Sequence, residues 1–428
     1  MRSVTATASD ITAQLERRRH AAAERWELSD EIVLVGAGEP ITIPGRGDRI
    51  YPFRSHSEYL YLTDRERPGG VLAFDPGEGW VDFVVPVSEP EIVWEGANPD
   101  DVEGTPIDRL DGWLESRRGR PIAWLGCGSA EPGGLELLDR VRRGLNHVRR
   151  PKDPVELGRL RSAIRATKNG FESLRAAIAP GISESELQVE LETGFRRAGG
   201  DGFAFDSIVA GGPNAAVLHF PPTARRLNDG ELVLVDAGAE YRAYAADVTR
   251  TYPVSGALTG LQAELHATVE RACRTAIDRC VPGAEWTEVH RSAAVVLAEG
   301  LVDVGVLKGE PESLFERGAA ALFSPHGIGH MVGLGVRDAS EVLPGRSPDP
   351  ALYPSLRMDL PLAAGYTVTV EPGVYFIPAL LADPDRRARH REAVDWDRVE
   401  RLYGFGGIRI EHDVLVTDSR PEVLTQEV

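Results

Sequence analysis

Hydrophobic residues follow two kinds of spacing in the first third of the chain, and both spacings predict regular elements. Residues 6–28 carry apolar side chains at helical intervals, which favours an opening amphipathic helix. Shorter apolar runs separated by Gly, Pro and Asp come next, and such runs are typical of strands. We expect these strands at residues 31–35, 58–62, 70–74, 80–85 and 121–125. With the helical patterns between them they predict a first domain of α/β type over residues 1–150.

Long amphipathic helices dominate after residue 150, where the charged, proline-containing segment 149–154 is typical of a linker. Three helix-start signals follow, each a capping residue with Glu or Gln three positions later. They are Asp153 with Glu156, Ser183 with Glu186, and Thr259 with Gln262. The third helix has one apolar face, which should pack against a sheet. That face consists of Leu261, Leu265, Val269, Cys273 and Ile277. Helices and further strands together predict a second domain of α+β type over residues 151–428.

Two strand-like runs in the second domain end in an acidic residue and repeat one another. Residues 231–238 (ELVLVDAG) align with residues 366–373 (YTVTVEPG), so that Asp236 matches Glu371. A carboxylate at the end of a buried strand costs free energy unless a cation or a donor lies beside it. The repeat therefore predicts two similar halves that face each other around a metal centre.

Five residues combine such a setting with metal-binding chemistry. They are Asp236, Asp247, His330, Glu371 and Glu411. Strand alternation also places Arg409 on the face of Glu411. Four carboxylates and one imidazole form an oxygen-rich set that exceeds what one ion needs. We therefore expect two divalent ions, with manganese preferred over cobalt or zinc, that activate a bridging water and polarise a carbonyl group.

Composition narrows the partners and the compartment. The chain has 428 residues, and its 48 basic and 66 acidic residues give a net charge of −18, which disfavours nucleic acid and anionic membrane surfaces as partners. No run has the apolar length of a signal peptide core or a membrane span, so we expect a cytoplasmic protein. Cys127, Cys273 and Cys280 lack the spacing of a zinc site, and we expect buried thiols in a reducing compartment.

The motifs around these residues resemble those of a known peptidase family. LVLVDAG with DVTRTYP, SPHGIGH, TVEPGVYF and GIRIEHD resemble the pita-bread metallopeptidases, and within them the proline-directed group of aminopeptidase P and prolidase. YPFRSHSEYLYLT in the first domain resembles the amino-terminal domain of that group. The resemblance implies a dinuclear site made of the five residues, an Xaa-Pro dipeptidase or aminopeptidase activity on short peptides, and a homodimer.

The resemblance also implies roles for individual residues. Glu371 would act as general acid and base, and His326 would stabilise the tetrahedral intermediate. His219 would line the substrate pocket and assist there. Arg409 would bind the C-terminal carboxylate of a dipeptide.

One position departs from the family pattern and keeps alternatives open. Seven residues after His330 the relatives usually have a histidine in a motif like DVHD, whereas this chain has Arg337 in GVRD. A guanidinium there suits a terminal carboxylate, so a carboxypeptidase on the same scaffold is the main rival among enzymes. A binding protein with an inactive peptidase fold is the rival from another class. The charged segment 383–401 is either a solvated insertion, or a lid or subunit contact.

Overall fold

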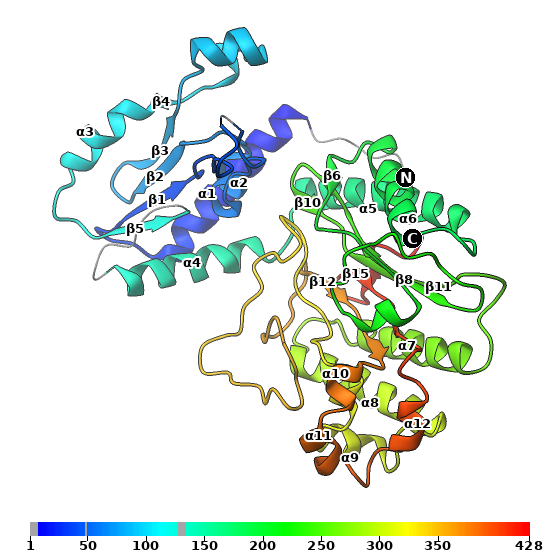
Figure 1. Ribbon diagram of the computed structural model, residues 1–428. Coiled ribbons are helices and arrows are strands. Elements are labelled where there is room, and N and C mark those ends of the chain that lie inside the picture. Colours follow the sequence, from blue (N-terminus) through cyan, green and yellow to red (C-terminus); the bar gives the residue numbers. More distant parts are fainter. Residues whose placement is uncertain (1–6, 48, 127–133) are drawn as a thin grey trace. The chain divides into compact units, whose positions relative to one another are not determined.

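The computed structural model describes residues 7–47, 49–126 and 134–428, which fall into two compact units on either side of the Arg149–Arg150 peptide bond (Figure 1). The predicted mixed α/β fold is confirmed. Cys127, expected as a buried thiol, lies outside the described residues. Among the described residues, no helix combines the length and the apolar character that crossing a membrane would require.

The N-terminal unit is built on one five-stranded sheet with the strand order β4-β3-β2-β1-β5. Its strands are β1 (Ile32–Gly36), β2 (Val71–Asp75), β3 (Gly79–Val84), β4 (Thr105–Pro106) and β5 (Ile122–Leu125). Its α-helices are α1 (Ala8–Trp26), α2 (Ser57–Thr63), α3 (Leu110–Glu115) and α4 (Leu135–Arg149). The indole nitrogen of Trp26 donates a hydrogen bond to the Val141 carbonyl at 2.9 Å, which ties α1 to α4.

The prediction of a strand at residues 58–62 is wrong, because these residues form α2. The alternating tyrosines and leucines were interpreted as a strand, but all five residues from Tyr59 to Thr63 are buried, as a short buried helix also allows. Asp64 ends the helix in the left-handed conformation, with φ 55° and its N–H bonded to the Leu60 carbonyl. The other four predicted strands correspond to β1, β2, β3 and β5 within two residues.

The unit of residues 150–428 places pairs of long helices on small antiparallel sheets. The sheets have the orders β11-β8-β7, β10-β9-β6, β12-β15-β16 and β13-β14. The strands are β6 (Gly202–Phe203), β7 (Ile208–Gly211), β8 (Leu232–Ala237), β9 (Ala239–Tyr241), β10 (Tyr244–Ala245), β11 (Val248–Pro253), β12 (Thr367–Val370), β13 (Gly373–Tyr375), β14 (Gly407–Arg409), β15 (His412–Leu415) and β16 (Glu422–Val423). The α-helices are α5 (Pro154–Ala177), α6 (Glu184–Arg197), α7 (Leu261–Ile277), α8 (Trp286–Asp303), α9 (Pro311–Glu316), α10 (Pro378–Leu381), α11 (Pro384–Arg389) and α12 (Trp396–Glu400).

Two hydrophobic clusters join helices to the strands that carry the acidic residues. Apolar residues of α5 and α6 pack with those of β8, and apolar residues of α7 and α8 pack with those of β12 and β15. Figure 1 shows α5 and α6 above the strands of this unit and α7 and α8 below them. The predicted apolar face of α7 is confirmed at Leu265, Val269, Cys273 and Ile277, which are all buried. Cys273 and Cys280 are buried free thiols, as expected.

Two of the three predicted helix starts are confirmed, and the third is wrong. Asp153 and Ser183 are N-caps with complete capping boxes. Helix α7 instead begins after Gly260, which has φ 51° and no capping side chain. The side-chain nitrogen of Gln262 donates instead to the Gly230 carbonyl at 2.9 Å.

The segment predicted to be a linker is built into the second unit. The Lys152 N–H donates to the Gly365 carbonyl at 2.8 Å. The Lys152 ammonium lies 3.0 Å from a carboxylate oxygen of Asp338, and both side chains are at most 1% exposed. A buried ion pair of this kind fixes the backbone at both of its ends. Residues 150–152 therefore anchor α5 and the loop that carries Asp338.

Candidate metal centre

The predicted metal ligands come from strand ends in two different sheets. Asp236 lies in β8 opposite Thr249 of β11, and Asp247 directly precedes β11. Glu371 directly follows β12, and Glu411 lies between β14 and β15. Antiparallel pairing and short turns thus bring residues that are far apart in the sequence to one place.

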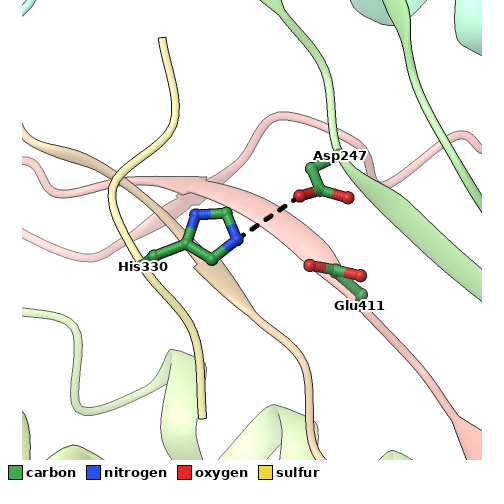
Figure 2. Close-up of side chains that lie close together, drawn as sticks. All are labelled: Asp247, His330 and Glu411. Atoms are coloured by element: carbon green, nitrogen blue, oxygen red, sulfur yellow. Dashed lines mark ion pairs between the residues drawn. The ribbon is translucent and has the colours of Figure 1, made fainter. Parts of the chain in front are cut away.

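Asp247, His330 and Glu411 form the tightest group among these residues. Each offers one ligand atom, and these atoms lie within 4.8 Å of one another. Figure 2 shows the three side chains pointing toward each other, with Nε2 of His330 3.5 Å from Oδ2 of Asp247. All three residues are at most 5% exposed. One imidazole and two carboxylates at this separation are suited to holding a divalent cation.

The hydrogen bonds of His330 leave the ring nitrogen that faces the carboxylates without a proton. Its Nδ1 lies 3.0 Å from the Met331 carbonyl oxygen, which can accept but not donate. Nδ1 therefore carries the hydrogen, and Nε2 presents a lone pair to Asp247. Burial lowers the pKa of His330 to about 4, so the ring is neutral at pH 7. A lone pair facing a carboxylate is unfavourable unless a cation lies between them, and this arrangement fits a metal ion.

Asp236 and Glu371 lie beside that group. Oε1 of Glu371 is 3.9 Å from Nε2 of His330. Oδ2 of Asp236 accepts a hydrogen bond from Arg409 at 2.5 Å, whereas its Oδ1 is buried and has no hydrogen-bond partner among the described residues. A buried carboxylate oxygen without a donor costs free energy. This oxygen is therefore also suited to a cation.

Repulsion among the carboxylates is visible in their pKa values. Burial and the carboxylates of Glu411 and Asp236 raise the pKa of Asp247 well above its usual value. Burial and the carboxylates of Glu371 and Asp236 do the same for Glu411. Burial raises the pKa of Glu371 to about 7, although the guanidinium of Arg409 opposes that shift. Divalent cations would reverse these shifts, because they favour the ionised carboxylates.

Arg409 lies in the site, but its guanidinium is directed to protein groups. Nε donates to the Thr249 hydroxyl at 3.1 Å, Nη1 to the Tyr375 hydroxyl at 2.8 Å, and Nη2 to Asp236. The residue is 3% exposed. These three contacts fix the guanidinium beside Asp236, so the geometry favours a positioning role over the predicted binding of a substrate carboxylate.

His326 is also held by protein groups at both ring nitrogens. Nδ1 lies 2.9 Å from the Gly327 carbonyl and therefore carries the hydrogen, while Nε2 accepts from the Tyr375 hydroxyl at 3.0 Å. Burial and the charge of Arg409 lower the pKa of His326 to about 3. Nδ1 is also 3.8 Å from Oε2 of Glu371. A hydrogen-bonded row thus runs from Arg409 through Tyr375 to His326.

A cavity of about 100 Å³ borders the site and collects the other predicted residues. Its polar lining consists of His219, Asp236, His326, His330, Arg337, Ser355, Arg357, Glu371 and Arg409. His219 is exposed, and partial burial together with the charge of Arg409 lowers its pKa. Every predicted site residue therefore lies either in this lining or in the buried group of Asp247, His330 and Glu411.

Two arginines in the lining, Arg337 and Arg357, act on the Glu371 carboxylate only through their charge. Neither Arg337 nor Arg357 takes part in a hydrogen bond or an ion pair within the described part of the chain, and both are exposed. The backbone next to Arg337 is held in place, because the neighbouring Asp338 forms an ion pair with Lys152. Arg357 is a lining residue that the sequence does not predict. It lies in an irregular polar stretch that follows Ser355 with φ 51°, and neither periodicity nor a motif marks it.

Comparison with known proteins identifies the family. Residues 158–418 match metallopeptidase family M24, and residues 15–105 match the N-terminal domain of aminopeptidase P. The chain belongs to metallopeptidase family M24. Like other members of this family, it is a metal-dependent peptidase, which confirms the expected class of enzyme.

Individual M24 relatives cover most of the chain. A probable Xaa-Pro aminopeptidase of Penicillium rubens is 30% identical over 96% of this chain and 88% of that protein. The Xaa-Pro dipeptidase of Mus musculus is 36% identical over 64% of this chain and 57% of that protein. The structure resembles aminopeptidase PepP of Pseudomonas aeruginosa with a TM-score of 0.79 and 28% identity, covering 97% of this chain and 95% of that one. The predicted pita-bread Xaa-Pro peptidase family is thus confirmed.

Proposed function

We propose that this M24 peptidase is an exopeptidase that cleaves the bond before proline in short peptides, most simply an Xaa-Pro dipeptidase or aminopeptidase with two divalent ions. The observation that carries the proposal is the grouping of Asp247, His330 and Glu411, with Asp236 and Glu371 beside them. Relatives named as Xaa-Pro aminopeptidases and Xaa-Pro dipeptidases support the preference for proline.

In this proposal all five residues hold the metal ions. A divalent ion in such a site acts as a Lewis acid on the scissile carbonyl and lowers the pKa of the attacking water. Manganese is our choice because the donor set is rich in carboxylate oxygen, and cobalt or zinc remain the alternatives. We further propose a homodimer in the cytoplasm. Metal analysis of the purified protein and sedimentation velocity are the corresponding tests.

Glu371 is the proposed general acid and base. It lies in the cavity lining, and its pKa of about 7 without metal shows how little the protein alone stabilises its charge. His219 and His326 face the same cavity, and we assign them to substrate contacts around the scissile bond. His326 is held there by Tyr375, whose hydroxyl is itself fixed by Arg409.

A second candidate is a carboxypeptidase, and it rests on Arg337 with Arg357. Two guanidinium groups at one cavity, without a hydrogen-bonded or ion-paired partner in the part of the chain that the structure describes, can receive a carboxylate. A dipeptide brings its terminal carboxylate one residue from the scissile bond, and so does a longer peptide that loses its last residue. The dipeptidase and the carboxypeptidase therefore share this contact, and they differ in whether a free N-terminus is required.

Three substrates separate these readings when they are assayed with manganese. Ala-Pro has both ends free, Ala-Pro-Ala amide has a blocked C-terminus, and acetyl-Ala-Pro has a blocked N-terminus. A dipeptidase cleaves the first alone, an aminopeptidase also cleaves the second, and a carboxypeptidase cleaves the third. No hydrolysis of any of them, together with no bound metal, would support the non-catalytic alternative.

A further inference from the structure

A second and larger cavity adjoins the metal cavity. Its volume is about 530 Å³, against about 100 Å³ for the metal cavity. Pro325 lines both, and the chain passes from the wall of one to the wall of the other between Pro354 and Ser355. We call the larger cavity the arginine chamber, after Arg317, Arg386 and Arg389 in its lining. Its size lies within the ordinary range for sites that bind organic ligands.

The three arginines of the chamber have no hydrogen-bonded or ion-paired side-chain partner in the described residues. They come from two separate segments, since Arg317 follows α9 and the other two belong to α11. Arg387, which is also in α11, instead pairs with Glu400 at 2.7 Å. Arg317 and Arg389 are exposed and Arg386 is half-buried, so the three guanidinium groups bring positive charge to the opening of the cavity in a chain with a net charge of −18.

The other titratable groups of the chamber do not neutralise this charge. Oδ1 of Asp383 accepts the backbone N–H of Arg386 at 2.8 Å, and Asp385 is the second carboxylate of the lining. His390 is 5% exposed, and burial, together with the charges of Arg389 and Arg317, lowers its pKa. Three positive charges therefore face two negative ones, which leaves the chamber suited to an added anion.

The rest of the lining is apolar and stiff. It includes Leu322, Leu380 and the three prolines Pro325, Pro350 and Pro354. Proline fixes its own φ, so these walls have little freedom to collapse into the cavity. An apolar wall with guanidinium groups at its rim suits a ligand that has a short hydrocarbon body and a carboxylate. The hydrocarbon can pack against the wall while the carboxylate pairs with the guanidinium groups.

We propose that the arginine chamber binds a carboxylate carried on a short hydrocarbon body. The carboxylate belongs either to an acidic residue of a longer peptide, whose scissile bond lies at the metal centre, or to a free dicarboxylate. The first source rests on the proposed peptidase function, and the second does not. Because the chamber adjoins the metal cavity, the first source makes the chamber a specificity site for peptides longer than a dipeptide.

The test uses the metal-loaded enzyme, the double variant Arg386→Gln with Arg389→Gln, and a control, Arg391→Gln. Arg391 is exposed, belongs to the same segment and does not line the chamber. The assay compares two Xaa-Pro peptides that differ at one position away from the scissile bond, where one has Glu and the other has Gln. This position is placed on whichever side of the scissile bond the enzyme accepts. We expect wild type and control to prefer Glu about tenfold in kcat/KM, the double variant to lose that preference, and cleavage of Ala-Pro to stay unchanged.

A calorimetric titration of the same three proteins with glutarate tests whether the chamber binds a free dicarboxylate. Saturable binding that weakens about tenfold in the double variant, and not in the control, supports a free dicarboxylate. This titration needs no catalysis, so it still tests the chamber if no peptide is cleaved. The proposal is overturned if the double variant matches wild type both in the Glu preference and in glutarate binding, or if Arg391→Gln has the same effect.

Discussion

The hydroxyl of Thr249 lies 2.6 Å from Oε2 of Glu411 and donates a hydrogen bond to it, in a place where neither residue is more than 2% exposed. The same hydroxyl accepts the Nε hydrogen of Arg409 at 3.1 Å. Glu411 is thereby held in one orientation. Groups that orient a metal ligand through such bonds change metal affinity or activity by about 10- to 100-fold when they are removed.

We therefore expect Thr249→Val to weaken metal binding by about 10- to 100-fold, because valine keeps the shape and removes the donor. Competition between the protein and a fluorescent chelator for manganese measures the effect. Thr268→Val is the matched control, since the Thr268 hydroxyl is bonded within α7 to the Glu264 carbonyl and touches no proposed ligand. Equal metal affinity in wild type and Thr249→Val would contradict the assignment of Glu411 as a ligand.

Tyr375→Phe tests the hydrogen-bonded row that ends at His326. The variant removes the hydroxyl that donates to His326 and accepts from Arg409. We expect kcat to fall about tenfold, which corresponds to ~1.4 kcal/mol of transition-state stabilisation, with metal content unchanged. Steady-state kinetics with Ala-Pro, alongside metal analysis, separates the two quantities. A change in KM alone would mean that the row orients bound substrate and not the reacting groups.

Arg337→Gln and Arg357→Gln test whether these two guanidinium groups of the metal cavity bind the terminal carboxylate of a substrate. A hydrogen bond to a charged group contributes about 1.5–3 kcal/mol, so kcat/KM for a substrate with a free C-terminus should fall about 10- to 100-fold in each variant. Any cleavage of the same substrate with an amidated C-terminus should be the same in wild type and variant. Metal content should also stay the same, because neither residue belongs to the proposed ligand set. Equal losses for the acid and the amide would contradict a role in carboxylate recognition.

Lys152→Met tests the buried ion pair with Asp338. Methionine keeps most of the volume but leaves a buried carboxylate without its cation, and such a change typically costs about 3–5 kcal/mol of folding stability. Urea unfolding measures this loss. The double variant Lys152→Met with Asp338→Leu should recover most of it, because no unpaired charge remains. A single variant as stable as wild type would mean that the ion pair does not anchor this part of the segment 149–154, which the sequence pattern predicts to be a linker.

The residues that the sequence pattern located well are those whose chemistry conflicts with their surroundings. Asp236 and Glu371 stand out because a carboxylate follows an apolar strand, and both do line the same cavity as His330 at the end of a buried strand. This signal lies within a few neighbouring residues, so it can be recognised in the sequence without knowledge of the fold. The motifs DVTRTYP, SPHGIGH and GIRIEHD add Asp247, His330 and Glu411.

The features that the sequence pattern missed depend on contacts between distant segments. Arg357 reaches the metal cavity because its loop returns there, and no spacing in the sequence records that return. Arg409 was expected to bind a substrate carboxylate, and its hydrogen bonds to Tyr375 of β13 and Asp236 of β8 could not be foreseen from the sequence. A strand was expected at 58–62, where the chain forms a helix. A segment that is buried on all sides has apolar residues at every position, so its sequence cannot distinguish the helical period from the strand period.

His290 makes the stability of the second unit depend on pH. It lies in α8, is 5% exposed, and its Nδ1 accepts the backbone N–H of Ile328 at 3.2 Å, next to the loop that carries His330. Burial lowers its pKa from 6.5 to about 4. In the unfolded chain the ring takes up a proton below about pH 6.5, whereas in the folded protein it stays neutral until about pH 4. Protons therefore favour the unfolded state in this window, and stability falls as the pH falls through it.

His290→Asn removes the titrating group and keeps an oxygen that can accept the Ile328 N–H. Between pH 8 and pH 5, we expect wild type to lose about 2 kcal/mol more stability than the variant, as a difference of that size in pKa implies. Urea unfolding at several pH values, with metal removed from both proteins, measures the two slopes. Other titrating groups contribute equally to both proteins, so they cancel in the difference. Parallel slopes would mean that His290 does not stay neutral in the folded protein.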